Sequence, residues 1–374
     1  VMTQNIGAGR PGVAYQARQL GLAFNAVLGV IMSLFLSLGA GTILSGVGVA
    51  DALMQPARTY LQIVGGFCIL NALIPICSSY LRAFGFSKEP LYASIIGNVI
   101  NFCLNAFFLF VLHKGVAGVA TATVISRIIN LVIVVLLGAV LVKAKQHPER
   151  ESNREVMGQI IRIGLPSACE TAIYNVSMTL VIRFLNQMDA QGLNVTARSY
   201  TMQITNFSYC VGAALAQANA IMTGWRIGAK EYDACDRGTR KAAIIGVIVA
   251  VILETMFALC SGWIMQLFSK DPQMVSLVGK LLAIDIVLEM GRVTNLVYGQ
   301  ALKTSGDAVF PVVMGACFMI LCSVGGTYLF GIRLGLLAVG AYIGMTGDEC
   351  VRAVGMYLRW KSGKWKEKGL VKSR

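Results

Sequence analysis

The sequence predicts an all-α membrane protein that crosses the bilayer many times. The 374 residues are 56% hydrophobic and only 13% charged, which is about half the charged fraction of an ordinary soluble domain. The apolar residues also lie in long runs, each of which can cross the ~30 Å hydrocarbon layer as a helix. A third observation is a repeat that pairs one half of the chain with the other, and it predicts two similar lobes.

We expect ten of these runs to form membrane-spanning helices. One apolar run could be a core helix of a soluble protein, but ten could not. Backbone polar groups in lipid must be satisfied inside each helix, and the runs show none of the alternation that membrane strands have. The expected helices cover 17–38, 56–81, 90–111, 116–142, 159–186, 195–222, 239–264, 275–301, 309–331 and 335–359.

The positive charges predict the orientation of these helices. The net charge is +14, but 22 of the 32 Lys and Arg residues fall in one set of alternate loops and in the C-terminal tail. The opposite loops hold only Arg58, Lys114, Lys270 and Arg333. The positive-inside rule makes the first set cytoplasmic. The tail "RWKSGKWKEKGLVKSR" is therefore expected to contact anionic lipid headgroups, and no nucleic-acid partner is expected.

A duplication organises the chain, because three pairs of segments resemble each other at a nearly constant separation. The matching pairs are "VMTQNIGAGR" (1–10) with "IMTGWRIGAK" (221–230), "LRAFGFSKEP" (81–90) with "LKTSGDAVFP" (302–311), and "KGVAGV" (114–119) with "LGLLAV" (334–339). The second pair has an offset of 221 residues, and the third is one residue out of register with it. The repeated glycine turns are expected to join helices at the cytoplasmic face.

The second copy has two helices before its glycine turn, whereas the first copy has none. We therefore expect the sequence to be part of a twelve-helix protein that lacks its first helix and most of its second. The expected architecture is two six-helix lobes in a parallel repeat, with the first lobe truncated and about ten complete helices. Residues 1–142 form the N-terminal lobe, with four helices plus the end of another. Residues 143–158 are a cytoplasmic linker, and 159–374 are the C-terminal lobe of six helices with its basic tail.

Several phrases, in order along nearly the whole chain, resemble the multidrug and toxic compound extrusion (MATE) family. They are "QNIGAGR", "LRAFGFSKEPLYASIIGNVINFCLN", "KGVAGVATATVIS", "GLPSACE" and "EMGRVTNLVYGQALKTSGDAVFP". The resemblance implies two lobes of six helices around a central cavity. It also implies export of organic, often cationic, compounds in exchange for protons or sodium ions. In many prokaryotic members an acidic residue on the first helix is central to ion coupling, and this sequence does not include that helix.

Acidic residues inside the expected helices are the main candidates for function, because a charge in lipid is costly unless it faces a cavity or a partner. Asp285, Glu289 and Arg292 have i, i+4 and i+7 spacing on one face of a helix, and Asn295 follows within one turn. We predict that they form a cation-coupling site for a proton or a sodium ion, and in the MATE family this region has that role. The alternative is a buried network that only fixes helix packing.

Glu170 and Tyr174 are a second candidate pair, at i and i+4 after Pro166. A carboxylate beside an aromatic ring suits an organic cation through charge attraction and cation–π contact. The alternative is an acid near a helix start that complements the helix dipole. Asp348 and Arg352, also at i and i+4, are expected to form a simple salt bridge.

Polar side chains on two other helices are candidates for lining the cavity. In the second half these are Gln203 and Asn206. A helix that faced only lipid would not need such polar side chains. In the first half, Asn98, Asn101 and Asn105 recur at spacings of three and four and share one face. Bonding between helices is the alternative for both sets. Glu254 is expected to reach toward the interface or the cavity mouth.

The favoured function is a secondary antiporter that exports organic cations or drugs through rocking of two lobes, with H⁺ or Na⁺ as coupling ion. The alternative is a flippase of lipid-linked oligosaccharides from the same superfamily. An enzyme is not expected, because the sequence shows no nucleophile elbow, paired His/Asp site or metal cluster, and no cofactor or structural metal is expected. We expect a monomer in the plasma or inner membrane with a cytoplasmic C-terminus.

Overall fold

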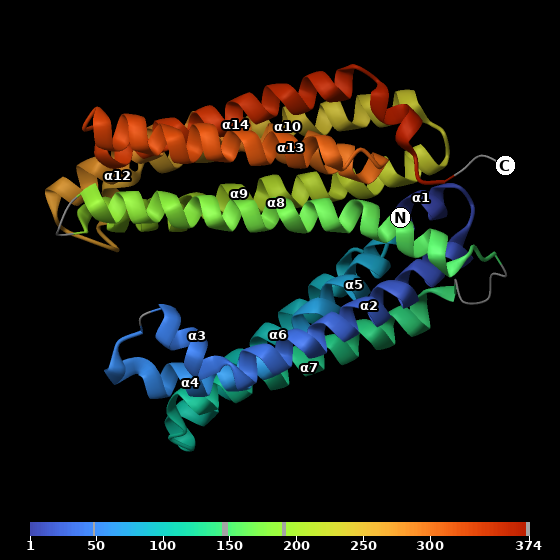
Figure 1. Ribbon diagram of the computed structural model, residues 1–374, viewed down its shortest axis with the longest axis horizontal. Helices are drawn as coiled ribbons and strands as arrows, with labels where there is room; N and C mark the ends of the chain where they lie inside the picture. Colours follow the sequence, from blue (N-terminus) through green and yellow to red (C-terminus); the bar gives the residue numbers. More distant parts are fainter. Residues whose placement is uncertain (48, 144–148, 189–191, 372–374) are drawn as a thin grey trace. The chain divides into compact units, whose positions relative to one another are not determined.

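The computed structural model describes residues 1–47, 49–143, 149–188 and 192–371. In these ranges the chain forms fourteen α-helices, four short π- or 3₁₀-helical segments and no β-strand, which confirms the predicted all-α class. Two compact units, Val1–Ile160 and Ile161–Arg374, are described separately below (Figure 1). Part of the expected linker, 144–148, lies outside the described residues. Its last part is helical, because α8 already begins at Asn153.

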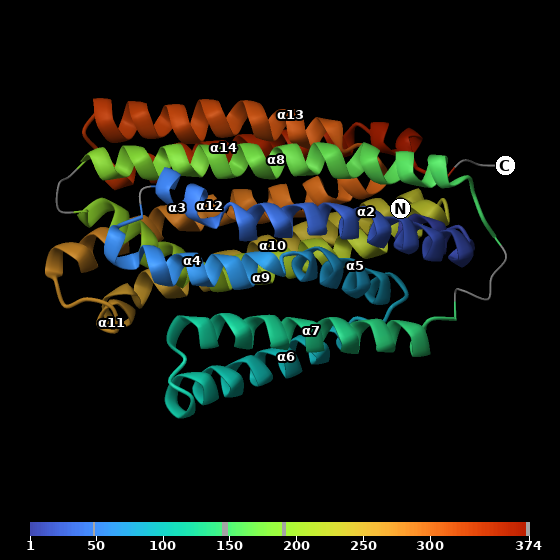
Figure 2. The ribbon, with the colours of Figure 1, turned by 60° about the horizontal axis from the view of Figure 1, so that its bottom comes forward.

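The N-terminal unit is a helix bundle in which α2 packs against α4 and α5, while α7 packs against α4, α5 and α6. Figure 2 shows α6 and α7 side by side. The elements are α1 (Met2–Gly7), α2 (Pro11–Leu38), α3 (Ala40–Val47), α4 (Asp51–Gly66), α5 (Ile69–Ala83), α6 (Lys88–Ala106), the π-helix η1 (Phe107–Val111) and α7 (Gly115–Leu141).

The C-terminal unit is built around α12, which packs against α9, α10 and α14. This central position buries residues along the whole length of α12. The elements are α8 (Asn153–Met188), α9 (Leu193–Gly228), α10 (Tyr232–Leu259), α11 (Ser261–Met265), α12 (Pro272–Ser305), α13 (Val309–Phe318), the π-helices η3 (Met319–Val324) and η4 (Thr327–Arg333), α14 (Leu337–Lys361) and the 3₁₀-helix η5 (Lys364–Lys368).

Five helices of the described chain are long and apolar enough to cross a membrane. They are α2, α6 with η1, α7, α10, and α13 with η3 and η4. A sixth span is the pair α4 and α5, which bends by 42° at a short break. The other four predicted spans correspond to α8, α9, α12 and α14, which have 25–36 residues but carry many polar and charged side chains. Polar spans of this kind belong in a bundle interior rather than against lipid.

The duplication predicted from the sequence is present in the backbone. The helices α2 and α10 begin at 11 and 232, α4 and α12 at 51 and 272, and α6 and α13 at 88 and 309, so each pair is separated by 221 residues. The turns also match. Gly9 (φ 72°) and Lys230 (φ 62°) both adopt the left-handed conformation, and their N–H groups donate to Ile6 O and Ile227 O at 3.0 Å.

One expected pairing of the repeat was wrong in register. The sequence paired Lys114 with Leu334, but the backbone pairs Lys114 with Leu336. Gly115 and Leu337 have nearly equal positive φ angles, 52° and 53°. The N–H groups of Lys114 and Leu336 also make the same kind of hydrogen bond across a π-helical turn, at 2.9 and 3.1 Å. The offset here is therefore 222, because the π-helical turn, rather than the glycine, is the repeated feature.

The halves differ at the second of these matched pairs, α4 and α12. In the N-terminal unit this helix breaks between α4 and α5, and Ser33 Oγ accepts a hydrogen bond from Ile69 N–H at 3.1 Å. That N–H belongs to the first residue of α5 and has no partner within its helix. In the C-terminal unit the equivalent helix, α12, is continuous over 34 residues. The unbroken helix allows charged side chains to be aligned along one face.

The C-terminal segment folds back on the end of its own unit through Asp307. Arg359 Nε and Lys368 Nζ donate to the two carboxylate oxygens of Asp307 at 2.7 and 2.8 Å. Burial favours the neutral carboxyl group, but these hydrogen bonds and charges outweigh burial and hold the pKa of Asp307 below its usual value. Gly306 (φ 100°) lies so close to Lys368 O that a Cβ atom there would be 2.2 Å from this oxygen.

Two tryptophans complete this contact. Trp360 and Trp365 stack with ring centroids 4.1 Å apart, and Trp365 Nε1 donates to Trp360 O at 2.9 Å. Trp360 Nε1 donates to Asp236 Oδ1 at 2.8 Å, which connects the end of α14 to α10. Trp365 and Leu370 are 1% and 5% exposed. The segment 362–371 is therefore anchored to its unit by buried apolar surface as well as by ion pairs.

We predict that Asp307→Asn loosens the segment 362–371 selectively. The change removes the negative charge that Arg359 and Lys368 share and leaves one acceptor oxygen in place of two, which is worth about 3 kcal/mol in a buried site. Hydrogen exchange of amides 364–371 measures the local opening free energy. Because the pKa of Asp307 is lowered in the folded protein, its stabilisation is present at neutral pH. It is lost as the pH falls from about 4 through the lowered pKa.

The matched control is Glu367→Gln, which removes an exposed acid from the same segment. This control should leave exchange unchanged. Equal exchange in wild type and Asp307→Asn would contradict the role assigned to the Asp307 ion pairs.

Candidate functional site

The centre of α12 carries buried charges. Asp285 and Glu289 are 2% and 0% exposed, and Arg292 donates a hydrogen bond from Nη1 to Glu289 Oε1. The predicted i, i+4, i+7 set therefore does gather on one buried part of a helix, although Asp285 and Glu289 do not share the guanidinium group equally. A full negative charge on Glu289 is tolerated there only because Arg292 is beside it.

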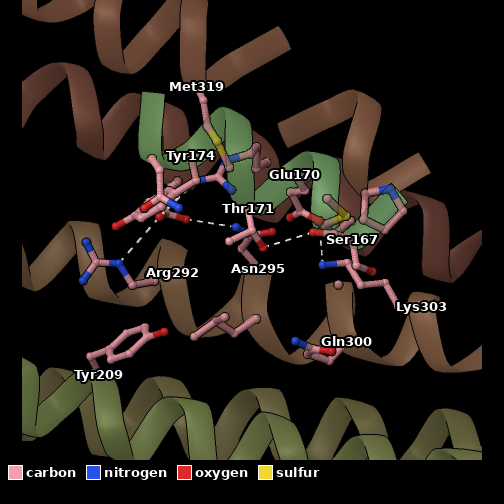
Figure 3. A pocket seen from close by; sticks show the side chains of 17 residues that line it. Ser167, Glu170, Thr171, Tyr174, Tyr209, Arg292, Asn295, Gln300, Lys303 and Met319 are labelled. Atoms are coloured by element: carbon pink, nitrogen blue, oxygen red, sulfur yellow. Dashed lines mark hydrogen bonds and ion pairs between the residues drawn. The ribbon is translucent and has the colours of Figure 1, made fainter. Parts of the chain in front are cut away.

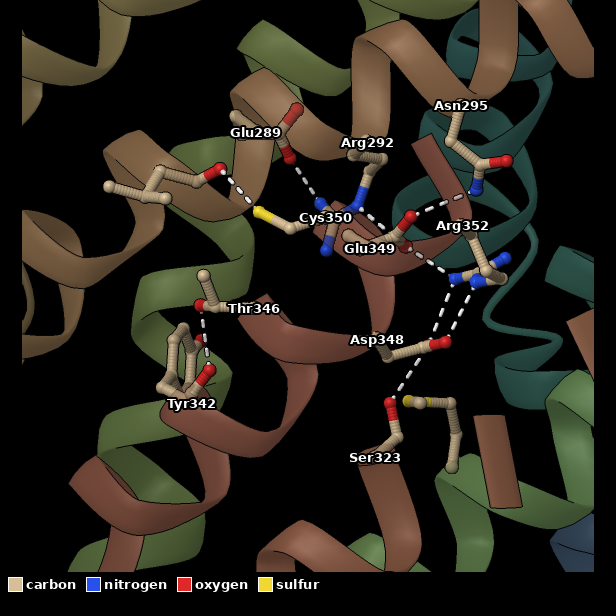
Figure 4. Close-up of polar contacts among 12 residues, drawn as sticks. Glu289, Arg292, Asn295, Ser323, Tyr342, Thr346, Asp348, Glu349, Cys350 and Arg352 are labelled. Atoms are coloured by element: carbon tan, nitrogen blue, oxygen red, sulfur yellow. Dashed lines mark hydrogen bonds and ion pairs between the residues drawn. The ribbon is translucent and has the colours of Figure 1, made fainter. Parts of the chain in front are cut away.

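Two residues of α14 extend this network across the helix interface (Figure 4). Arg292 Nε lies 3.6 Å from Glu349 Oε1, and Asn295 Nδ2 donates to Glu349 Oε2 at 3.0 Å. Arg352 Nη2 lies 3.0 Å from Glu349 Oε1 on the other side. Glu349 is thus held between two guanidinium groups and one amide group. The predicted candidate Asn295 has a direct role in fixing its carboxylate.

The predicted salt bridge between Asp348 and Arg352 is confirmed. Arg352 Nε and Nη2 donate to the two oxygens of Asp348 at 2.7 and 2.9 Å, the bidentate geometry that makes such pairs strong. Ser323 Oγ in η3 adds a third hydrogen bond, to Asp348 Oδ2 at 2.9 Å. All of the carboxylate oxygens of this acid are therefore satisfied.

A cavity of about 520 Å³ opens beside this network (Figure 3). Glu170 on α8 lines it, and Lys303 Nζ lies 2.6 Å from Glu170 Oε2. Both side chains are 17% exposed, so the pair is accessible from the cavity while being mostly shielded from water. The lining residues are Ser167, Glu170, Thr171, Tyr174, Asn175, Tyr209, Arg292, Asn295, Leu296, Gly299, Gln300, Lys303, Pro311, Met319, Glu349, Arg352 and Met356.

A smaller cavity of about 210 Å³ is a neighbour of the first, because Tyr174, Tyr209 and Arg292 line both. Asp285 and Asn206 line this smaller cavity. The Arg292 guanidinium carbon also lies 6.0 Å from the centroid of the Tyr209 ring. The two cavities are lined by acids, bases, aromatic rings and methionines, which is a suitable lining for organic molecules with a charged group.

The remaining predicted polar residues have more ordinary positions. Gln203 on α9 is exposed and does not line either cavity. In the N-terminal unit, Asn101 Nδ2 donates to Ser126 Oγ at 3.3 Å, and Asn105 Nδ2 donates to Asn101 Oδ1 at 3.1 Å. These bonds join α6 to α7, while Asn98 is exposed. A role in lining an N-lobe cavity stays a prediction for these three asparagines.

Three functional candidates were missed by the sequence interpretation. They are Lys303, Glu349 and Arg352, of which only Arg352 was expected to have a partner, Asp348. Each of them acts across helices that are far apart in sequence, so spacing along one helix carried no signal for these contacts. In the part of the chain that the structure describes, no group of three or more His, Cys, Asp or Glu side chains is placed to hold a metal ion.

These features define a polytopic membrane transporter with paired charges around an internal cavity. The MatE family profile matches residues 1–107 and 166–329. The chain therefore belongs to the MatE family, the multidrug and toxic compound extrusion transporters. This family consists of transporters and not of enzymes.

The relatives and solved structures agree with this assignment. The chain is 32% identical to the uncharacterized transporter YisQ of Bacillus subtilis over 99% of its own length and 82% of that protein. It is 23% identical to the probable multidrug resistance protein NorM of Thermotoga maritima, over 91% and 76% of the two chains.

The fold is similar to that of a MATE protein crystallised in the straight conformation, with a TM-score of 0.86 and 19% identity over 98% and 82% of the chains. It is also similar to a MOP superfamily transporter from Pyrococcus furiosus, with a TM-score of 0.88 and 18% identity over 100% and 83%.

We predict that Arg292→Met destabilises the protein because it leaves Glu289 buried without its partner. Breaking a buried pair in this way costs about 3–5 kcal/mol. The double variant Arg292→Met/Glu289→Gln removes both charges and should recover most of the loss. Thermal unfolding of the purified protein in detergent checks this. Arg183→Met, at an exposed position of α8, is the control, and a double variant no more stable than Arg292→Met would refute the pairing argument.

Proposed function

We propose that this protein is a secondary antiporter that exports organic compounds, often cationic, in exchange for protons or sodium ions. The observation that best supports this is the ion pair between Glu170 and Lys303 at the wall of a 520 Å³ cavity. A cavity of this size fits a drug-like molecule. The substrate then crosses the membrane as the two lobes rock, so that the cavity opens first to one side and then to the other.

The Glu170–Lys303 pair suggests how a cationic substrate is recognised. In the absence of substrate, Lys303 neutralises the Glu170 carboxylate, so no unpaired charge remains in this partly shielded site. An organic cation can displace the lysine and take over the carboxylate, while Tyr174 on the same helix offers its ring face. Recognition is therefore an exchange of one cation for another, which lowers the cost of desolvating Glu170.

The Glu289–Arg292–Glu349 network is the proposed coupling region. Arg292 contacts both acids, so a proton or sodium ion that neutralises one acid strengthens the hold of Arg292 on the other. Arg292 also lines both cavities. A change in its position would alter the charge that the substrate meets. Ion binding and substrate release are thereby linked through one side chain, with Asp285, Glu289 and Asn295 as its neighbours.

A flippase of lipid-linked oligosaccharides is the alternative function, and nothing favours it over export. Its pyrophosphate substrate would need a cavity dominated by free positive charge. Here the basic residues that line the larger cavity, Lys303, Arg292 and Arg352, are each paired with an acid. The relative from Thermotoga maritima is named as a probable multidrug resistance protein, which favours export.

We further propose that the protein is a monomer in the plasma or inner membrane, with its C-terminus in the cytoplasm. The distribution of Lys and Arg between alternate loops supports this orientation. The basic segment that ends the chain would then face anionic headgroups.

Export predicts a specific loss in Glu170→Gln. Cells that express the full protein should expel a fluorescent organic cation, and this variant should retain it, because the neutral amide cannot replace the lysine-paired carboxylate. Glu289→Gln should likewise abolish the dependence of efflux on the ion gradient. The readout is the rate of fluorescence loss from preloaded, energised cells.

The matched control for the efflux test is Asp307→Asn, which removes an acid of the same lobe outside the cavity. It should keep efflux. If Glu170→Gln and Glu289→Gln also kept wild-type efflux at equal expression, these residues would have no part in transport.

The proposed orientation predicts the outcome of reporter fusions at the C-terminus. In bacterial cells, a green fluorescent protein fused after Arg374 should fluoresce, and alkaline phosphatase at the same point should be inactive, because the first folds in the cytoplasm and the second outside it. A fusion inserted after Lys270, in a loop expected to be external, should give the opposite pair of results. Active phosphatase at the C-terminus would reverse the assignment.

A further inference from the structure

Glu254 on α10 is a buried acid that the proposed mechanism does not use. Its side chain is 0% exposed, and among the described residues neither of its carboxylate oxygens has a hydrogen-bond partner. Ser208 on α9 faces it. The Ser208 hydroxyl group is 1% exposed and also lacks a hydrogen bond of good geometry, although it is near enough to act on the carboxyl group electrostatically.

The packing of α10 on α12 places Glu254 beside the charges of the site. A Cβ atom on Gly246 would lie 2.6 Å from Val293, so the two helix backbones approach closely at this level. Consecutive helices joined by the short α11 run in opposite directions. Glu254 is eight residues after Gly246, and Asp285 is eight residues before Val293, so these acids lie at the same level of the bundle.

The charges that act on Glu254 are mostly of its own sign. They come from Asp285, Glu289 and Arg292 of α12, and Ser208 contributes a dipole from α9. Arg292 is already engaged by Glu289 and Glu349. One oxygen of Asp285 and one of Glu289 also lack a hydrogen-bond partner in the described structure. Three acids therefore lie near one another, and Arg292 is the base that acts on Glu254.

The equivalent position in the first half of the protein has a hydrogen-bond donor beside it. Ser33 is the counterpart of Glu254 at the offset of 221, and it accepts a hydrogen bond from Ile69 N–H at the break between α4 and α5. The counterpart of Ile69 is Met290, which lies inside the continuous α12, where its N–H is used by the helix itself. Glu254 thus occupies a position that faces the middle of the central helix but finds no donor there.

An ionised carboxylate in such a place is strongly disfavoured, and the neighbouring acids disfavour it further. A proton removes the charge at a single carboxyl oxygen and needs no further ligand, whereas a sodium ion needs several oxygen ligands around it. We propose that Glu254 is a further ion-binding residue of the transporter and that it carries a proton in this conformation. This inference rests on the proposed antiport and identifies the proton as the ion bound there.

The proton has a clear relation to the coupling region. A neutral Glu254 leaves Arg292 to balance Glu289 and Glu349. When water reaches the cluster in another conformation, Glu254 releases its proton and adds a negative charge that competes for Arg292. Loading or unloading this one group therefore changes the partner of the guanidinium group that lines both cavities.

Infrared difference spectroscopy of the full protein in lipid vesicles tests the proposal directly. At pH 7 the wild type should show the carbonyl band of a protonated carboxyl group, and Glu254→Gln should lose it. Asp348→Asn is the matched control, because Asp348 is also buried but both of its carboxylate oxygens are paired with Arg352; this variant should keep the band. Identical spectra for wild type and Glu254→Gln would overturn the proposal, as would loss of the band when sodium chloride replaces potassium chloride.

A second measurement needs no variant and so does not depend on how the variant folds. A hydrophobic carbodiimide reacts with protonated carboxyl groups in apolar surroundings. Peptide mapping of the treated wild type should find the adduct on Glu254 at pH 7 and not on Asp348. An adduct on Asp348 with none on Glu254 would contradict the assignment.

Transport distinguishes this proposal from the proposed function. Cation efflux driven by an imposed pH gradient should lose its gradient dependence in Glu254→Gln. If efflux is absent from wild type as well, antiport fails, while the infrared and carbodiimide results still decide the protonation of Glu254. If wild-type efflux depends on the gradient and Glu254→Gln behaves identically, the proton at Glu254 takes no part in coupling and this inference fails alone.

Discussion

The guanidinium group of Arg292 is the constraint on which the rest of the C-terminal unit depends. Three acids lie around it: Glu289 on its own helix, Glu349 on α14 and, more remotely, Asp285. A buried acid–base cluster is retained for specificity or function rather than for stability, since apolar residues would pack there at lower cost. The position of α12 between α9, α10 and α14 follows from this, because the charged centre must be covered on every side.

The carboxyl groups of this unit fall into two kinds according to their partners. Asp348 accepts three hydrogen bonds and is fixed, so it positions Arg352 against Glu349. Glu170 has a single lysine, which can leave. Acids whose oxygens are all hydrogen-bonded are fixed in place, whereas acids with fewer partners are the ones that can change partner. Fixed pairs hold the helices in register while the exchangeable ones face the cavity.

Much of the fold was predictable because it depends on local properties of the chain. Long apolar runs predicted the helices, and the repeated "IGA" turns predicted the duplication that the matching φ angles of Gly9 and Lys230 now show in the backbone. The i, i+4, i+7 set on α12 was predictable for the same reason, since all three residues share one helix.

The pairing of Lys303 with Glu170 was not predictable, because 133 residues separate them and the contact exists only after α8 and α12 have packed. The break between α4 and α5 was also missed, since hydropathy continues through it and only Ser33 on another helix compensates the exposed N–H.

The duplicated halves therefore solve one problem in two ways. A helix that has polar groups at the middle of a membrane can expose backbone N–H and C=O groups at a break, or it can align charged side chains along an unbroken face. The bend at Phe67 and Cys68 in the first half corresponds, at the offset of 221, to Leu288 and Glu289 in the second. The N-terminal unit thus has a capped backbone break at the level where the C-terminal unit has its buried acid–base pair. A backbone N–H cannot gain or lose a charge near neutral pH, whereas a carboxyl group can. Of these two equivalent positions, only the one in the C-terminal half therefore carries a group that can titrate.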